Sequence, residues 1–166
     1  MAQVYVSIGS NIERRQHIES ALRMLAELFG PLVQSSVYES AAVGFESAPF
    51  YNLVVGFETD LSPGVVRDHL HAIEDSNGRD RSADLGARTL DLDILLYDDL
   101  VTDRDGVELP RPDIARYAFV LGPLAEIAGS LRHPVFGNRF DEMWSEFRDD
   151  SQVLQRVDWP AGATPG

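Results

Sequence analysis

The stretch Arg88-Thr89-Leu90-Asp91-Leu92-Asp93-Ile94-Leu95-Leu96-Tyr97 alternates between apolar and acidic side chains over its first half. Successive side chains of a β-strand point to opposite faces, so the alternation predicts a strand with Asp91 and Asp93 on one face. Two neighbouring carboxylates repel each other, and a cation between them removes the repulsion. The pattern is therefore typical of a metal site, but also of an edge strand with a solvated acidic face. The motif alone leaves both interpretations open.

Three arginines precede the two aspartates within a short span of the chain: Arg79, Arg81 and Arg88. The formal net charge of −13 argues against broad nucleic-acid binding, which requires a basic surface. An acidic protein that binds a polyanion needs local positive charge, a divalent metal ion, or both. Carboxylates and arginines at one end of a strand therefore indicate a metal-bridged polyphosphate site.

Length and composition predict one globular domain over residues 1–158 and a disordered tail over residues 159–166. The chain has no cysteine, which excludes disulfides and thiolate metal sites. It has no long apolar run and no secretory signal pattern, so we expect a cytoplasmic protein.

Hydrophobic periodicity and turn residues predict an alternation of strands and helices. The expected elements are a strand at 4–8, a helix at 12–29 capped by Ser10 or Asn11, strands at 32–38 and 50–58, a helix from 63 to the Asn77-Gly78 stop, and a strand at 88–97. This order predicts an α+β fold of the ferredoxin-like (βαββαβ) plan, an antiparallel sheet with two helices on one face. The C-terminal third is expected to add a small extension, half helix and half core strand over 117–127, with a short helix at 140–147.

Five segments stand in the order typical of one known family: Ser7-Ile8-Gly9-Ser10-Asn11, Phe50-Tyr51-Asn52, Gly78-Arg79-Asp80-Arg81, the run from Gly86 to Tyr97, and the run from Ala118 to Leu124. Up to about Ile127 the chain resembles the 6-hydroxymethyl-7,8-dihydropterin pyrophosphokinases of folate synthesis. The resemblance implies a ferredoxin-like fold. It also implies an Mg²⁺-dependent transfer of pyrophosphate from ATP to the pterin hydroxymethyl group, with release of AMP.

The resemblance assigns the reacting groups to the acidic strand and the segment before it. Asp91 and Asp93 match the pair that holds two Mg²⁺ ions on the ATP phosphates, and oxygen ligands suit that hard cation. Arg79 and Arg88 match the arginines that steady the phosphates and the leaving AMP. The implied ATP-binding set is Glu74, Arg79, Arg81, Arg88, Ile94 and Arg111.

The resemblance also assigns a pterin site. Asn52 matches the residue that hydrogen-bonds the pterin amide edge, and Phe50 and Phe119 match two aromatic residues that stack on the ring. The backbone around Ser40, Val43 and Gly44 matches the segment that binds the rest of the pterin.

The chain departs from the family pattern at a few positions. Leu85 and Ala87 stand where the family usually has Trp and Pro, Arg111 replaces a usual histidine, and Tyr117 occupies a place where arginine is common. Two alternatives stay open. One is a diverged relative that acts on a different reduced pterin, and the other is a non-catalytic module of the same fold that binds a nucleotide or a protein. The expected partners are ATP and a reduced pterin, without nucleic acid or membrane, for a monomer or alternatively a dimer.

Overall fold

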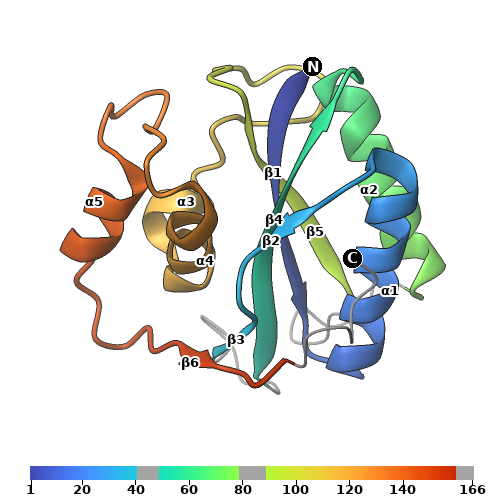
Figure 1. Cartoon of the computed structure of the whole chain (residues 1–166), viewed down its shortest axis with the longest axis horizontal. Helices are drawn as coiled ribbons and strands as arrows, with labels where there is room; N and C mark the ends of the chain where they lie inside the picture. The colour runs from blue at the N-terminus through green and yellow to red at the C-terminus, as the bar shows by residue number, and fades with distance from the viewer. Residues whose placement is uncertain (41–48, 79–88, 160–166) are drawn as a thin grey trace.

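The computed structural model describes residues 1–40, 49–78 and 89–159 (Figure 1). Several residues assigned from the sequence lie outside these ranges, and so does the predicted tail 159–166 apart from Trp159, which packs against the hydrophobic core. They are Val43, Gly44, Arg79, Arg81, Leu85, Ala87 and Arg88.

One antiparallel sheet forms the centre of the protein, as the sequence predicts. Its three long strands are β5 (Asp91–Tyr97), β1 (Ala2–Ser10) and β4 (Phe50–Thr59), which lie in that order. The sheet continues through β3 (Tyr38–Ser40) to β6 (Gln155–Arg156), and β2 (Val33–Gln34) pairs with another part of β4. The chain therefore has an α+β fold with β1 and β4 at its middle.

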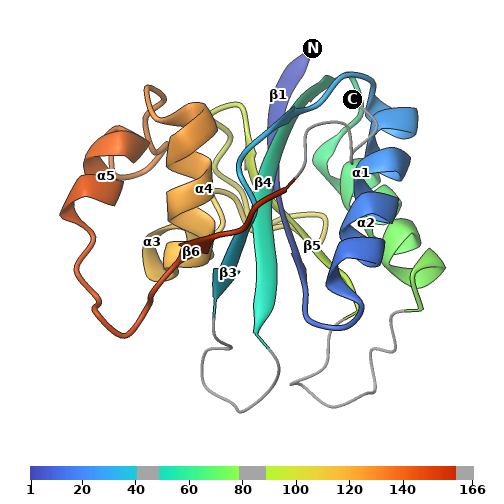
Figure 2. The same ribbon diagram turned by 60° about the horizontal axis from the view of Figure 1, so that its bottom comes forward.

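Helices cover both faces of this sheet (Figures 1 and 2). Two long helices, α1 (Arg14–Phe29) and α2 (Pro63–Ser76), pack on one face. The other face carries α4 (Ala118–Ala128), which contacts β4 and is itself flanked by α3 (Asp113–Arg116) and α5 (Phe140–Glu146). The C-terminal third thus forms a complete second layer rather than a small extension. None of the helices described is both long and apolar enough to span a membrane.

Strand alternation divides the buried side chains into two hydrophobic cores. Leu92 and Ile94 of β5 belong to the core beneath α1 and α2, whereas Leu95 belongs to the core beneath α4. The pairing of β1 with β5 shifts register between Tyr5 and Val6, because Tyr5 pairs with Leu96 and Val6 with Ile94. The alternation of side chains along β5 changes at this irregularity. Because Leu92 and Ile94 point toward α1 and α2, the intervening aspartates point to the α4 side of the sheet.

The start of α1 differs from the prediction. The helix begins at Arg14, and Glu13 adopts a left-handed conformation with no side-chain cap. Ser10 is instead the last residue of β1, and its hydroxyl donates to the carbonyl oxygens of Ile12 and Thr89 at 3.1 and 2.6 Å. The predicted cap at Ser10 or Asn11 was therefore wrong. The Ser10 hydroxyl instead links the segment that follows β1 to Thr89, which lies just before β5.

The predicted strand at 32–38 is divided into β2 and β3. Between them Ser35 hydrogen-bonds to both main-chain groups of Val54. Its amide donates to the Val54 carbonyl, and its hydroxyl accepts from the Val54 amide, each at 2.9 Å. A side chain thus replaces one backbone partner, which interrupts the regular ladder.

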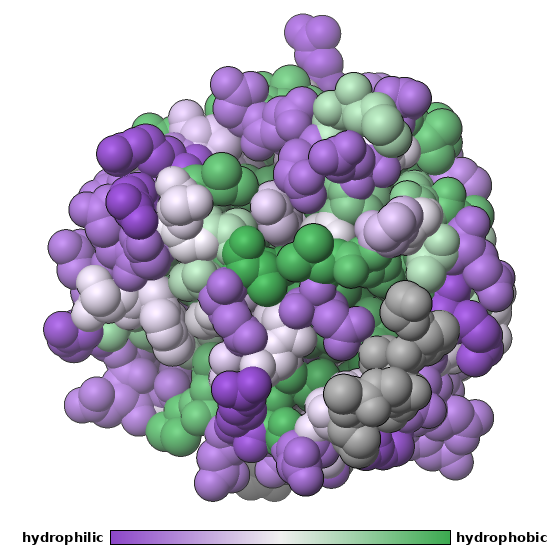
Figure 3. Space-filling model, in the orientation of Figure 1, coloured by the Kyte–Doolittle hydropathy of each residue, from purple (hydrophilic) through white to green (hydrophobic). Residues whose placement is uncertain are grey.

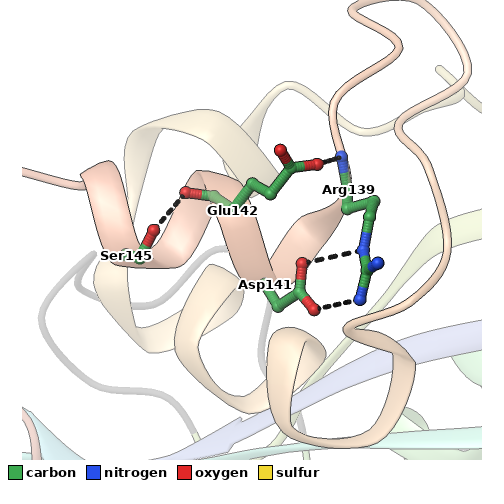
Figure 4. Close-up of polar contacts among 4 residues, drawn as sticks. All are labelled: Arg139, Asp141, Glu142 and Ser145. Carbon is green, nitrogen blue, oxygen red and sulfur yellow. Dashed lines mark hydrogen bonds and ion pairs between the residues drawn. The ribbon is translucent and has the colours of Figure 1, made fainter.

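The segment 117–127 was expected to be half strand, but α4 is helical throughout. Its residues contact the sheet on one side and α5 on the other, so apolar residues occupy most of the helix surface apart from Glu126. Such a helix lacks the 3.6-residue period that distinguishes helix from strand in a sequence. Its neighbour α5 begins with a capping arrangement in which the Glu142 carboxylate accepts from the Arg139 amide, and the Arg139 guanidinium pairs with Asp141 (Figure 4).

The surface in the view of Figure 3 is mostly hydrophilic, with a hydrophobic band across its middle near β2. Val33 of β2 contributes an exposed apolar side chain, 60% accessible to solvent. Exposure of single apolar residues is ordinary for a folded chain and identifies no site by itself.

Gly56 of β4 provides a test of the packing on the α4 side. A methyl group at this position would lie 2.7 Å from Cε1 of Tyr5, its partner on β1. We expect Gly56→Ala to lower the free energy of unfolding by about 1–3 kcal/mol, measured by urea denaturation. Tyr5→Leu in the same background should relieve part of the loss. An unchanged midpoint in Gly56→Ala would contradict the described position of the tyrosine ring.

Candidate active site

One row of paired residues crosses the sheet and contains both halves of the site. Asp91 of β5 lies opposite Gly9 of β1, and Gly9 lies opposite Asn52 of β4. A methyl group on Gly9 would be 2.9 Å from the Oδ1 atom of Asn52. Gly9 therefore leaves the space between the acidic strand and the Asn52 amide free of a side chain.

The two aspartates lie as their spacing predicts, partly exposed and on one face, while Leu90, Leu92 and Ile94 are buried. The pKa of Asp93 is raised from 3.8 to about 7, chiefly by burial and next by repulsion from the neighbouring Asp91 carboxylate. Arg111 acts in the opposite direction, but its attraction does not offset these two effects. The acidic pair therefore carries negative charge that the described neighbours do not fully compensate.

Arg111 stands beside the acidic pair. Its Nη2 atom lies 3.5 Å from Asp93 Oδ1, and its Nε atom lies 3.2 Å from Asp113 Oδ2. The Arg111 amide donates to the Leu95 carbonyl at 3.0 Å, which attaches this segment to β5. Burial alone lowers the pKa of the guanidinium, but the surrounding carboxylates raise it above its ordinary value. Arg111 is thus a fixed positive group next to the carboxylates.

A cavity of about 180 Å³ opens beside the acidic strand, against α2. It brings together Asp93, Ile94 and Arg111, three of the residues assigned from the sequence. It also contains Arg67 and His71 of α2, which the sequence did not assign to the site. The complete lining is Arg67, Leu70, His71, Leu92, Asp93, Ile94, Gly106, Val107, Glu108 and Arg111.

Glu74 supports the backbone of the acidic strand. Its carboxylate is buried and accepts a hydrogen bond from the Leu92 amide at 2.8 Å. Because Leu92 lies between the two aspartates, this contact fixes the segment that carries them. The family resemblance places Glu74 in the ATP-binding set, and that assignment stays a prediction. Its contact with Leu92 was not visible from the sequence.

The residues assigned to the pterin gather at the adjoining ends of β3 and β4. Ser40 pairs with Phe50, and the buried Asn52 amide donates to the Ser40 hydroxyl at 2.7 Å. Phe119 lies at the start of α4, on the same side of the sheet, with its ring stacked on Tyr117 at a centroid distance of 5.0 Å. Tyr117, which stands where the family often has arginine, therefore forms one continuous aromatic surface with Phe119.

The carboxylates of Asp91 and Asp93 fit a magnesium ion that is also coordinated by the phosphates of a bound substrate. Among the described residues, no group of three or more His, Cys, Asp or Glu side chains is arranged around a common metal position. Mg²⁺ is commonly bound by only one or two carboxylates, with substrate phosphates and water completing its coordination. Two partly exposed carboxylates on one face of a strand match that mode of binding.

Comparison with known proteins decides the family. A sequence model of the 7,8-dihydro-6-hydroxymethylpterin-pyrophosphokinases (HPPK) matches residues 5–129. The chain belongs to this family.

Named relatives cover nearly the whole chain. The Haemophilus influenzae 2-amino-4-hydroxy-6-hydroxymethyldihydropteridine pyrophosphokinase is 37% identical over 157 residues, which span 92% of this chain and 98% of that protein. The Pseudomonas aeruginosa protein of the same name is 40% identical over 136 residues, which span 80% and 84% of the two chains. The chain is therefore an enzyme of the pyrophosphokinase type that serves folate biosynthesis, which disfavours a non-catalytic module.

The fold is also similar to that of solved structures. The wild-type Plasmodium falciparum HPPK-DHPS structure superposes with a TM-score of 0.69 over 87% of this chain, at 14% identity. At that identity the likeness concerns the fold alone. The matched region is 44% of the HPPK-DHPS chain, so this chain spans less than half of that protein.

The raised pKa of Asp93 predicts a pH dependence of stability. Since the folded chain binds the Asp93 proton more tightly than the unfolded chain, this group stabilises the fold fully below pH 3.8 and loses that contribution as the pH rises through about 7. We expect Asp93→Asn, which stays neutral, to become more stable relative to the wild-type chain across that interval. Urea unfolding without divalent metal measures the difference.

Asp99→Asn is a matched control for that experiment, because it removes an exposed carboxylate just after β5. A stability difference between Asp93→Asn and wild type that stays constant from pH 4 to 8 would contradict the raised pKa.

Proposed function

We propose that the chain transfers pyrophosphate from ATP to the hydroxymethyl group of 6-hydroxymethyl-7,8-dihydropterin and releases AMP. We further propose that it does so on a ferredoxin-like βαββαβ frame with two Mg²⁺ ions. The observation that carries this proposal is the row that joins Asp91, the bare Gly9 and Asn52 across the sheet. The row supports the proposal because it puts an acidic strand that could hold metal ions and an amide that could bind a pterin on one face of the sheet.

Asp91 and Asp93 would hold the metal ions. When bound, Mg²⁺ neutralises phosphate oxygens and makes the β-phosphorus open to attack by the pterin hydroxyl. The protein contributes two carboxylates fixed on a strand that is attached to α2 through Glu74 and Leu92. The crowding that raises the pKa of Asp93 favours a cation at this place.

The cavity beside β5 would take part of the ATP molecule. Ile94 would supply an apolar wall. The Arg111 guanidinium, which now contacts Asp93, would instead donate to a phosphate oxygen of ATP. The sequence adds Arg79, Arg81 and Arg88 as further phosphate ligands. Glu74 completes the proposed ATP-binding set.

The pterin would lie on the α4 side of β4. Asn52 would hydrogen-bond its amide edge, and Phe50 and Phe119 would stack against its ring. The backbone at Ser40, Val43 and Gly44 would bind the remaining polar groups of the pterin. Transfer depends mainly on positioning and charge stabilisation, so the proposal assigns no side chain as a strong general base.

AMP release from ATP with Mg²⁺, measured against a panel of reduced pterins, tests the proposed function. We expect turnover with 6-hydroxymethyl-7,8-dihydropterin. Turnover with only a different reduced pterin would show that the proposed substrate is wrong while the proposed type of reaction is right. Absence of AMP with every pterin would contradict the enzyme activity itself.

Asp91→Ala and Asp93→Ala should each lower kcat by roughly 100-fold or more, since each removes a proposed metal ligand from the site of charge development. The fold should persist, because both side chains are partly exposed rather than packed in a core. Steady-state AMP release and far-UV circular dichroism measure the two effects, with Asp99→Ala as the control. Near-normal turnover in either variant would exclude that residue as a metal ligand.

Arg111→Leu should raise the KM for ATP by about tenfold, because it removes a charged hydrogen-bond donor for phosphate. The KM for the pterin should change little. Arg116→Leu is the control, since it removes an exposed arginine from the neighbouring α3. An ATP KM equal to that of the wild type would remove Arg111 from the nucleotide site.

A further inference from the structure

Arg14, the first residue of α1, joins three parts of the β3–β4 region. Its Nη1 atom donates to a Glu39 carboxylate oxygen at 2.9 Å and to the Pro49 carbonyl oxygen at 3.1 Å. Its guanidinium carbon lies 3.8 Å from the centroid of the Tyr51 ring. One side chain therefore contacts the end of β3, the residue before β4 and the second residue of β4.

These contacts differ from those of an ordinary surface ion pair. The Arg14 and Glu39 side chains are only 27% and 35% exposed, so solvent screens their attraction less than it would at an open surface. A cation over an aromatic face adds an interaction that does not depend on the carboxylate. Arg14 therefore restrains two strands simultaneously, where an isolated exposed pair contributes little.

The restrained strand ends carry the proposed pterin residues on their opposite face. Glu39 pairs with Tyr51, and the adjacent pair is Ser40 with Phe50. Because side chains alternate along a strand, Ser40 and Phe50 point away from Arg14 while their backbone neighbours are held by it. Asn52 lies on that same opposite face and binds the Ser40 hydroxyl.

Over the residues that the structure describes, the ladder between β3 and β4 is short, with three residue pairs from Tyr38–Asn52 to Ser40–Phe50. So short a ladder is prone to fraying at its end, because few backbone hydrogen bonds oppose the entropy gained on opening. Ser40 and Phe50 form the last of these pairs. A contact from α1 that holds the adjacent Glu39–Tyr51 pair would oppose fraying at the position where the pterin is proposed to bind.

We propose that Arg14 is a positioning residue for the pterin substrate. It touches neither substrate, and it holds the ends of β3 and β4 in the arrangement in which Ser40, Phe50 and Asn52 receive the pterin. This inference rests on the proposed function, since it assigns a role at that same site. It predicts a defect specific to the pterin and not to ATP.

The test compares Arg14→Leu with Arg23→Leu, which removes the same charge from an exposed position on the same helix. With 6-hydroxymethyl-7,8-dihydropterin as substrate, we expect Arg14→Leu to raise the pterin KM by about tenfold. The ATP KM, and kcat at saturating pterin, should stay within about twofold of wild type. Arg14→Lys keeps the charge and should recover part of the pterin affinity.

A double-variant cycle tests the contact itself. Glu39→Gln should raise the pterin KM less than Arg14→Leu does, because the contacts of Arg14 with Pro49 and Tyr51 remain. Combining the two changes should be little worse than Arg14→Leu alone, since both remove one interaction. Independent, multiplicative effects would show that the Arg14–Glu39 contact does not transmit the effect.

The outcomes separate this inference from the proposed function. Turnover by the wild-type chain with a pterin KM in Arg14→Leu equal to that in Arg23→Leu would overturn the role of Arg14 and leave the proposed function intact. Equal losses in pterin KM, ATP KM and kcat, together with a lowered unfolding midpoint, would also overturn it, because they indicate a general structural role. Failure of the wild-type chain to use or bind the pterin would overturn both.

Discussion

Repulsion between two carboxylates on one short strand is the constraint on which the site depends. Asp91 and Asp93 point to the same face of β5, and burial together with mutual repulsion raises the pKa of Asp93 to about 7. The fold keeps them together because Leu92 and Ile94 are buried on the other face. The Glu74 carboxylate also holds the Leu92 amide from outside the sheet. Hydrophobic burial and one buried hydrogen bond thus maintain an arrangement that a cation would stabilise.

The same sheet connects this acidic edge to the proposed pterin site. β1 lies between β5 and β4, and its residue in the shared row is Gly9, whose missing side chain leaves room beside the buried Asn52 amide. On the other face of β4, Arg14 holds the strand ends that carry Ser40 and Phe50. One face of the sheet thus carries the groups proposed to bind the ligands, and the other carries the contacts proposed to hold the backbone beneath them.

The sequence predicted the parts of the fold that depend on local pattern. The alternation from Leu90 to Ile94 placed both aspartates on one face, and the Ser62-Pro63 and Asn77-Gly78 signals set the ends of α2. It failed where tertiary contacts override local signals. The Ser10 hydroxyl bonds to the Thr89 carbonyl oxygen instead of capping α1, and α4 is apolar over most of its surface because it is covered by the sheet and by α5.

The candidate site was predictable to the extent that its residues stand in recognisable motifs. Asp93, Ile94 and Arg111 do meet at one cavity, but Arg67 and His71 carry no motif and were found only from the geometry. The contacts of Arg14 likewise depend on two strands that are distant from it in sequence. Such contacts follow from the packing of α1 against the sheet and leave no local signature.

The most direct test of the central claim is a crystal structure with Mg²⁺, a non-hydrolysable ATP analogue and a 6-hydroxymethylpterin. We expect two ions at about 2.0–2.1 Å from oxygens of Asp91 and Asp93, bridged to the phosphates, with the pterin beside Asn52. Metal ions bound to the nucleotide without contact to either aspartate would contradict it.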